Sequence, residues 1–212
     1  MSLSNGWIVY TDWTKPAGRF IKRFATTWIV PPPPLKKSGQ KVYLFNGIQS
    51  PDNMILQPVL QWGNSAVGGG DFWSVSCWYA GGGGGPANYS RLVPVNSSQS
   101  LTGVIELVDC DNIGFSPVFS YMCSFEGIDD TKLIKNRIQE LSLCYEVLEA
   151  YGLQAKDNYP ASDKTVMGGI EIMLDNGEAV LNWKVNNRIT DCGQHIDVVS
   201  NNSPGGEVDI FY

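Results

Sequence analysis

Short apolar runs, rich in β-branched and aromatic residues, recur at similar intervals along the whole chain. They span residues 7–10, 24–30, 41–48, 54–62, 72–79, 89–95, 101–108, 118–125, 166–174, 179–183 and 208–212. Clusters of Gly, Pro, Asn and Ser separate these runs, which is typical of antiparallel sandwiches and barrels. Because no linker interrupts the pattern, we expect residues 1–212 to form a single all-β domain with little helix. The expected fold is an antiparallel β-sandwich of the concanavalin-like or jelly-roll-like kind.

Several segments carry local turn signals. Asp-Asn-Gly at residues 175–177 predicts a tight hairpin, because Asn-Gly supplies the positive φ of a type I′ turn. Four prolines at residues 31–34 predict a stiff segment that leaves the sheet. Glycines at residues 68–70 and 81–85 predict two mobile loops that gate a ligand site, with slack turns as the alternative. Residues 131–151 fit both helical spacing and, in their second half, strand alternation, and their propensity favours helix.

The charge composition limits the partners. The 212 residues carry a net charge of −6, and only 17% of them are charged. A nucleic-acid surface needs clustered Lys and Arg, and the only basic cluster, residues 19–23, fits a solvated strand end. No apolar run approaches the roughly 20 residues of a membrane span. The first nine residues lack the pattern of a signal peptide, so we expect a cytoplasmic protein, with secretion after removal of a signal as the alternative.

Neither a metal nor a cofactor is expected. The five cysteines, whose spacing matches no metal motif, are Cys77, Cys110, Cys123, Cys144 and Cys192. We expect free thiols, with a Cys110–Cys123 bridge as the alternative in a secreted protein. Residues 109–112 predict an Asx-rich hairpin turn more simply than a calcium loop. His195, three residues after Cys192, is too close in an extended strand to face that thiol squarely.

Two neighbouring runs place polar side chains on one face of the predicted sheet. Alternate residues of a strand share a face, so Gln57 and Gln61 point the same way. In the next run, Ser74, Ser76 and Trp78 share a face. Amides and an indole on one sheet face indicate a wet, functional concavity.

Four segments, in this order, resemble the glutamic peptidases of the eqolisin family, which have a β-sandwich fold. The segments are residues 28–32, 47–49, 54–62 and 72–79. The resemblance implies peptide hydrolysis at acid pH by a Gln–Glu pair. In such a pair the Glu is general acid and base toward a water molecule, and the Gln orients that water and stabilises the oxyanion. Gln57 matches the family glutamine. The resemblance also implies a strand over residues 141–151, which we therefore expect in place of a helix.

The second catalytic residue fits the resemblance less well. The family's late strand reads Glu-Trp-Ile-Val-Glu, and residues 145–149 read Tyr-Glu-Val-Leu-Glu. In this register Tyr145 takes the catalytic position. A shift of one residue would bring in Glu146, but such a slip turns a strand side chain to the other face. The catalytic candidates are therefore Gln57 with either Glu146 or Glu149, and we expect weak or no peptidase activity.

Two functions from different classes follow. A binding module would hold a carbohydrate or an extended peptide in a groove without cleaving it. The residues expected to line that groove are Gln57, Gln61, Trp62, Trp73, Trp78 and Tyr145. The alternative is an acid glutamic endopeptidase that uses a Gln–Glu pair to activate water. In a third interpretation the tryptophans are core residues and the glutamines lie on a solvated sheet face.

Overall fold

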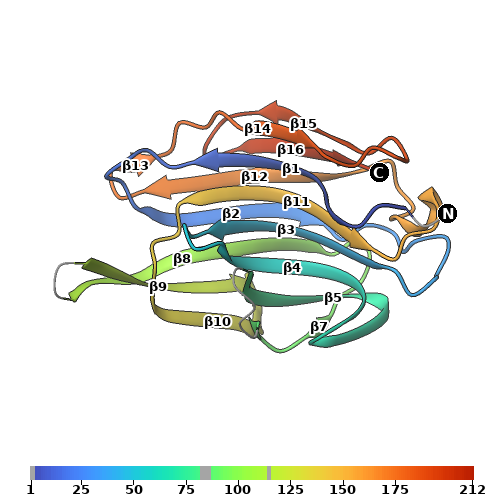
Figure 1. The fold of residues 1–212 in the computed structure, drawn as a ribbon, viewed down its shortest axis with the longest axis horizontal. Coiled ribbons are helices and arrows are strands. Elements are labelled where there is room, and N and C mark those ends of the chain that lie inside the picture. Colours follow the sequence, from blue (N-terminus) through green and yellow to red (C-terminus); the bar gives the residue numbers. More distant parts are fainter. Residues whose placement is uncertain (1–2, 82–86, 114–115) are drawn as a thin grey trace.

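A computed structural model of the protein describes residues 3–81, 87–113 and 116–212. Two antiparallel sheets of eight strands each form a β-sandwich, as the turn pattern predicts (Figure 1). The one helical element of the described residues is a 3-10 turn, η1 (Lys156–Asn158). The expectation of an all-β sandwich with little helix is therefore confirmed.

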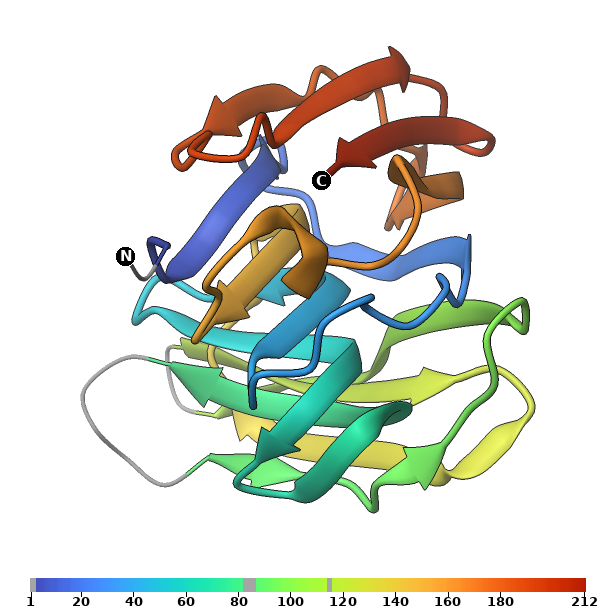
Figure 2. The same ribbon diagram turned by 90° about the vertical axis from the view of Figure 1, so that its right-hand side faces the viewer.

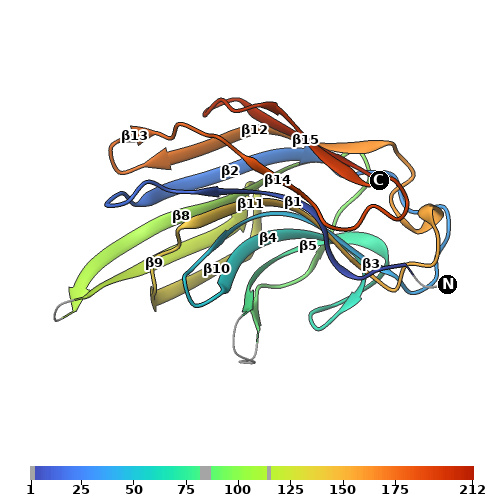
Figure 3. The same ribbon diagram turned by 45° about the horizontal axis from the view of Figure 1, so that its top comes forward.

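The first sheet carries the polar face that the sequence indicates. Its strand order is β14-β1-β11-β3-β4-β5-β6, and β7 pairs with β5. The bounds are β14 (Lys184–Asn187), β1 (Gly6–Thr14), β11 (Leu143–Tyr151), β3 (Lys41–Gln49), β4 (Met54–Ser65), β5 (Gly68–Gly81), β6 (Asn88–Tyr89) and β7 (Val93–Pro94). The central strands of this sheet bend along their length, as Figure 3 shows.

The second sheet packs against the inner face of the first. Its strand order is β10-β9-β8-β2-β12-β16-β15, and β13 pairs with β12. The bounds are β10 (Ile128–Ile138), β9 (Ser116–Phe125), β8 (Ser100–Ile113), β2 (Ile21–Ile29), β12 (Lys164–Leu174), β16 (Gly206–Phe211), β15 (His195–Ser200) and β13 (Gly177–Glu178). The last strands of the chain lie together in the upper part of Figure 2.

Several local expectations are confirmed. In the ambiguous segment, residues 131–138 are strand as part of β10 and residues 143–151 are strand as β11, and the four residues between them are not helical, so the helical alternative is wrong. Leu174 pairs with Gly177 across the predicted tight turn, and Gly177 has a φ of 127°. The proline segment follows the end of β2 and carries only an isolated bridge at Pro34.

Other local expectations are wrong. Residues 68–70 begin strand β5 instead of forming a mobile loop, because they pair with the end of β4. Residues 109–112 lie within β8 instead of in a turn. Residues 179–183 alternate between buried and exposed side chains but join no sheet ladder. The second glycine loop falls on residues 81–85, of which only Gly81 lies within the described part of the chain.

The main core fills the space between the sheets, and its largest fully buried side chains include Trp28, Trp62, Tyr121 and Phe24. A second, smaller apolar cluster covers the outer face of the first sheet. It consists of Phe45, Ile55, Val59, Tyr145 and Val147, with Trp7, Tyr10, Tyr43, Trp78 and Leu143 packed around it. The first sheet therefore has apolar side chains on both of its faces.

Gly103 of β8 allows the two sheets to approach closely. A Cβ at this position would lie 2.7 Å from Asn46 Oδ1 and 2.7 Å from Pro58 Cγ on the first sheet, and 2.9 Å from Trp28. We expect Gly103→Ala to lower the free energy of unfolding by about 1–3 kcal/mol, the usual cost of overpacking a core. Urea unfolding measures this change.

Gly168 of β12 provides the matched control, because a Cβ there would meet its nearest atom, Val166 Cγ1, at an ordinary 3.7 Å. Gly168→Ala should leave the stability within about 0.5 kcal/mol of the wild type. Equal effects of the two substitutions would contradict the assignment of Gly103 to a close inter-sheet contact.

Candidate functional site

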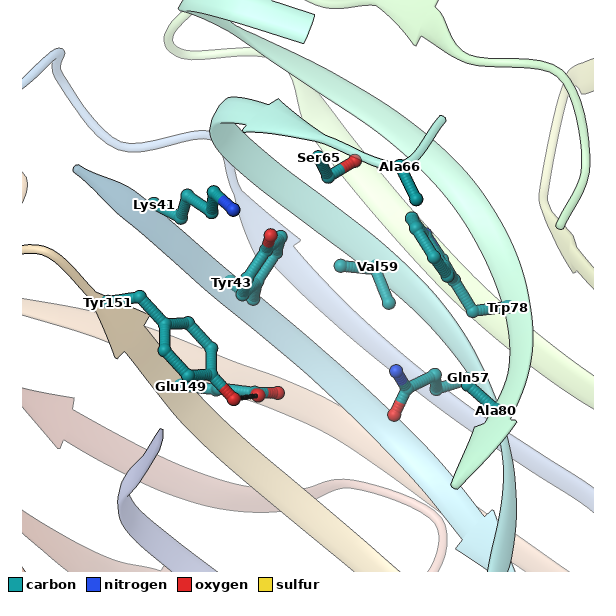
Figure 4. A pocket seen from close by; sticks show the side chains of 10 residues that line it. All are labelled: Lys41, Tyr43, Gln57, Val59, Ser65, Ala66, Trp78, Ala80, Glu149 and Tyr151. Carbon is teal, nitrogen blue, oxygen red and sulfur yellow. Dashed lines mark hydrogen bonds between the residues drawn. The ribbon is translucent and has the colours of Figure 1, made fainter. Parts of the chain in front are cut away.

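A pocket of about 290 Å³ lies on the outer face of the first sheet. Its lining residues are Lys41, Tyr43, Gln57, Val59, Ser65, Ala66, Trp78, Ala80, Glu149 and Tyr151 (Figure 4). They come from β3, β4, β5 and β11 and from the turn between β4 and β5. The pocket confirms that Gln57 and one tryptophan, Trp78, line one concavity.

The row of residues through Gln57 crosses the sheet at right angles to the strands. Gln57 pairs with Trp78 on β5, and Tyr145 on β11 pairs with Gly47 on β3. A Cβ at Gly47 would lie 3.4 Å from Gln57 Cβ, so Gly47 is the direct neighbour of Gln57. Tyr145 and Gln57 therefore flank Gly47, and the side chain of Ile55 packs on this glycine, 2.9 Å from the position that a Cβ would take.

Three glutamines share this face, and two of them already have partners. Gln49 Oε1 accepts a hydrogen bond of 2.7 Å from the hydroxyl of Tyr145. Gln61 is fully buried, and its Nε2 donates to the carbonyls of Gly63 (3.1 Å) and Gly68 (2.9 Å). Gln57 has no side-chain hydrogen bond to any described residue, and its Oε1 is buried without a partner. The amide of Gln57 is thus available to a ligand.

Glu149 is the carboxylic acid of the pocket. It receives hydrogen bonds from the Tyr151 hydroxyl and from Trp7, and it forms no ion pair with a described residue. Burial raises the pKa of Glu149 above its usual range, and the two hydrogen bonds only partly offset this rise. Burial and the nearby Glu149 charge also raise the pKa of Tyr43 to about 12. Glu149 is therefore neutral over a wider pH range than an exposed glutamate.

The strand register separates Glu149 from the row of Gln57. Glu149 pairs with Tyr43, and Tyr43 pairs with Gln61. Glu149 is four residues from Tyr145 along β11, which corresponds to about 13 Å along a strand. Glu149 and Gln57 therefore occupy different sides of the same pocket, as Figure 4 shows.

Glu146 does not belong to this pocket. Its side chain is fully buried between the sheets, where the hydroxyl of Thr26 on the second sheet donates to its Oε1 at 2.5 Å. Adjacent residues of a strand point to opposite faces, so Glu146 cannot share the face of Tyr145 and Glu149. The assignment of Glu146 as a catalytic candidate is wrong for this reason.

Four of the expected ligand-binding residues do not line the pocket. Trp62 and Trp73 are only 1% and 2% exposed and pack edge to face in the main core, with ring centroids 5.4 Å apart. Gln61 is buried beneath the β4–β5 hairpin. Tyr145 is on the outer face, but its ring packs against Trp7 and its hydroxyl is bound to Gln49. The core interpretation is thus correct for two tryptophans and wrong for Trp78.

Three further residues line the pocket but were not predicted from the sequence: Lys41, Tyr43 and Tyr151. A signal existed, since Lys41 and Tyr43 lie at even spacing from Gly47 and so share its face. Tyr151 is two residues from Glu149 in β11 and therefore shares its face. What the sequence did not provide was the order of the strands, which brings β3 between β4 and β11.

Within the described ranges, no group of three or more His, Cys, Asp or Glu side chains is arranged to hold a metal ion. All five cysteines are free, so the Cys110–Cys123 bridge is not formed. His195 stacks on Phe211, with ring centroids 4.2 Å apart. In the same described residues there is no helix long and apolar enough to cross a membrane.

No protein-family model matches this chain, and no curated protein sequence matches it significantly. Solved structures do match over their full length. Scytalido-glutamic peptidase with a peptide-based transition state analogue aligns with a TM-score of 0.61 at 13% identity, covering 100% of both chains. SCP-B, a member of the eqolisin family in complex with the tripeptide Ala-Ile-His, aligns with a TM-score of 0.58 at 13% identity, also covering 100% of both chains. The chain therefore has the β-sandwich fold seen in glutamic peptidases.

Proposed function

We propose that this protein binds an extended peptide in the pocket on the outer face of the first sheet and does not hydrolyse it. The observation that carries the proposal is the amide of Gln57, which lines the pocket and has no hydrogen-bond partner among the described residues. A buried amide without partners is costly, and a ligand that supplies them recovers this cost.

The other lining residues suit a peptide. Trp78, Tyr43 and Tyr151 present aromatic surface, which packs against peptide side chains and excludes water. The Gln57 amide can both donate to a carbonyl and accept from an N–H, the two groups that a peptide backbone repeats. Both similar peptidase structures contain a peptide or a peptide-based inhibitor, which supports a peptide over a carbohydrate as the ligand.

Hydrolysis lacks a suitably placed acid next to Gln57. The position that the family resemblance assigns to the catalytic glutamate holds Tyr145, which is aligned with Gln57 across Gly47. A phenol with a pKa raised to about 12, mainly by burial, cannot act as a base at acid pH. Glu146 points into the core. These placements favour a groove that binds and does not cleave.

A second candidate function is acid hydrolysis by Gln57 and Glu149. The observation in its favour is that both residues line the same pocket. The raised pKa of Glu149 would keep it protonated, as a general acid requires, at mildly acidic pH. The strand register argues against this function, because it separates Glu149 along β11 from Tyr145, the residue in the row of Gln57.

The test of the proposed function is the loss of peptide affinity in Gln57→Ala. We expect this substitution to weaken binding of short peptides by about tenfold, because it removes one or two hydrogen bonds from a desolvated site. Equilibrium dialysis against a pool of random tripeptides, with mass spectrometry as the readout, measures the affinity. Gln139→Ala, which changes an exposed glutamine outside the pocket, should leave it unchanged.

A cleavage assay of the same peptides from acid to neutral pH separates the two candidates. Hydrolysis that disappears in both Gln57→Ala and Glu149→Gln would replace the binding proposal with the peptidase. If wild-type protein neither binds nor cleaves the peptides, both proposals fail. A glycan array on which binding depends on Gln57 would show that the ligand is a carbohydrate instead.

A further inference from the structure

The polar groups of the pocket are unevenly distributed. Lys41 lies toward the end that the β4–β5 hairpin borders, and Gln57 lies toward the other end (Figure 4). Lys41 forms neither an ion pair nor a hydrogen bond with a described residue, although its side chain lines the pocket. The hydroxyl of Tyr43, the next outward-facing residue of β3, likewise has no partner in the described part of the chain. One end of the pocket therefore offers a cation and a neutral donor.

The acid of the pocket does not neutralise Lys41. Glu149 already accepts hydrogen bonds from Tyr151 and Trp7, and no oxygen of Glu149 lies within ion-pair distance of the Lys41 ammonium. Tyr151, not Glu149, is the direct strand neighbour of Lys41. The positive charge at this end of the pocket is consequently open to an anionic group of a ligand.

The hairpin beside Lys41 forms a fixed wall. Gln61 holds it from beneath, since its buried Nε2 donates to the carbonyls of Gly63 and Gly68 on the two arms. Ser65 Oγ donates to Gln61 Oε1 at 3.0 Å, so the turn is also fastened to the same side chain. Ser65 and Ala66 border the pocket from this turn. This arrangement gives buried Gln61 a role: it supports the wall that ends the pocket.

We propose that the peptide ligand ends in this pocket, with its free C-terminal carboxylate bound by the Lys41 ammonium and the Tyr43 hydroxyl. This inference rests on the proposed function. The preceding residues of the peptide then extend past Val59 toward Gln57 and Trp78. A carboxylate complements a cation and a hydroxyl donor, and hydrogen bonds with a charged partner are the stronger ones. The wall that the β4–β5 hairpin forms borders the end of the pocket at which the carboxylate would lie.

The test compares tripeptides that differ only at the C-terminus. A pool of random tripeptides, and Ala-Ile-His as a single member, are prepared as free acids and as amides. Equilibrium dialysis against the 212-residue protein gives the affinity for each form. We expect the wild type to bind the acids about tenfold more tightly than the amides, and we expect this preference to decrease as salt is added.

Lys41→Met keeps the aliphatic stem and removes the charge. In this variant acids and amides should bind equally, at about the wild-type affinity for the amides. Lys37→Met is the matched control: Lys37 lies over the ring of Trp62, outside this pocket, and its removal should leave the tenfold preference intact.

Several results would overturn the inference. If the wild type binds acids and amides equally while Gln57→Ala still weakens both, the C-terminal site is wrong and the proposed function stands. If Lys41→Met weakens acids and amides alike, Lys41 contributes packing and not charge recognition. If amides with an internal Asp bind as tightly as the free acids, the site recognises an acidic side chain. If neither form binds, the proposed function itself fails.

Discussion

Replacing Tyr145 by glutamate should give the protein an acid-dependent peptidase activity about 10² to 10⁴ times that of the wild type, the usual contribution of a general acid–base group. The register supports this expectation, because Tyr145 and Gln57 flank Gly47 in one row across the sheet. A carboxyl at residue 145 would lie in the same row as the free amide of Gln57, on the other side of Gly47, where the side chain of Ile55 packs on the glycine. Peptide cleavage followed between pH 3 and 7, at about one-unit steps, measures the gain.

The controls separate catalysis from altered binding. Tyr145→Gln removes the phenol without adding an acid and should stay inactive. Tyr145→Glu combined with Gln57→Ala should lose most of the gained activity, because the amide that orients the water and stabilises the oxyanion is gone. A folded Tyr145→Glu protein that binds peptides but does not cleave them would contradict the expectation that a carboxyl at residue 145 is sufficient for cleavage.

The alternation of side chains along a strand is enough to exclude two tryptophans, Trp62 and Trp73, from the groove. Gln61 and Trp62 are adjacent in β4, so they must face opposite sides of the sheet, and only one could line the groove. Trp73 likewise has the opposite parity to Trp78 in β5. Both tryptophans belong to the core for this reason. The fold and the placement of Gln57 and Trp78 at one concavity could therefore be predicted from the sequence, together with the exclusion of these two indoles.

The rest of the site depends on contacts between distant segments. Lys41 and Glu149 meet at one pocket only because β3 lies between β4 and β11. Sequence periodicity gives the face of a residue within its own strand but not the identity of the neighbouring strands or their register. The partners of Gln61 follow from the hairpin geometry that the glycines at residues 63 and 68 permit, both with positive φ. Neither arrangement has a local signal in the sequence.

Glu146 should make the protein less stable as the pH rises. The residue is fully buried between the sheets, and among the described residues its Oε1 has Thr26 as partner while its Oε2 has none. Burial raises the pKa of Glu146 well above its usual range, and the Thr26 hydrogen bond offsets this only in part. Its strand neighbours, Thr11 and Asn46, are uncharged and each leave a buried oxygen without a partner. A protonated Glu146 can donate to such an oxygen, whereas a carboxylate cannot.

The direction of the pH effect follows from proton binding. Above about pH 4.3, the usual pKa of glutamate, the unfolded chain loses this proton while the folded protein keeps it. The folded state then binds more protons, so the free energy of unfolding falls with pH, by at most about 1.4 kcal/mol per pH unit for this one group. The decline ends where the folded protein releases the proton, at the raised pKa of Glu146.

Glu146→Gln should remove this contribution, because an amide stays neutral at every pH while still accepting from Thr26. We expect the variant to be more stable than the wild type at neutral pH, with the difference shrinking toward pH 4. Urea unfolding at a series of pH values measures both slopes. Glu149→Gln is the control, since it removes only the smaller pKa shift of the partly buried acid in the pocket. Identical slopes in Glu146→Gln and the wild type would mean that Glu146 ionises in the folded protein as readily as in the unfolded chain. In that case a solvating partner, such as a buried water, must satisfy Oε2 between the sheets.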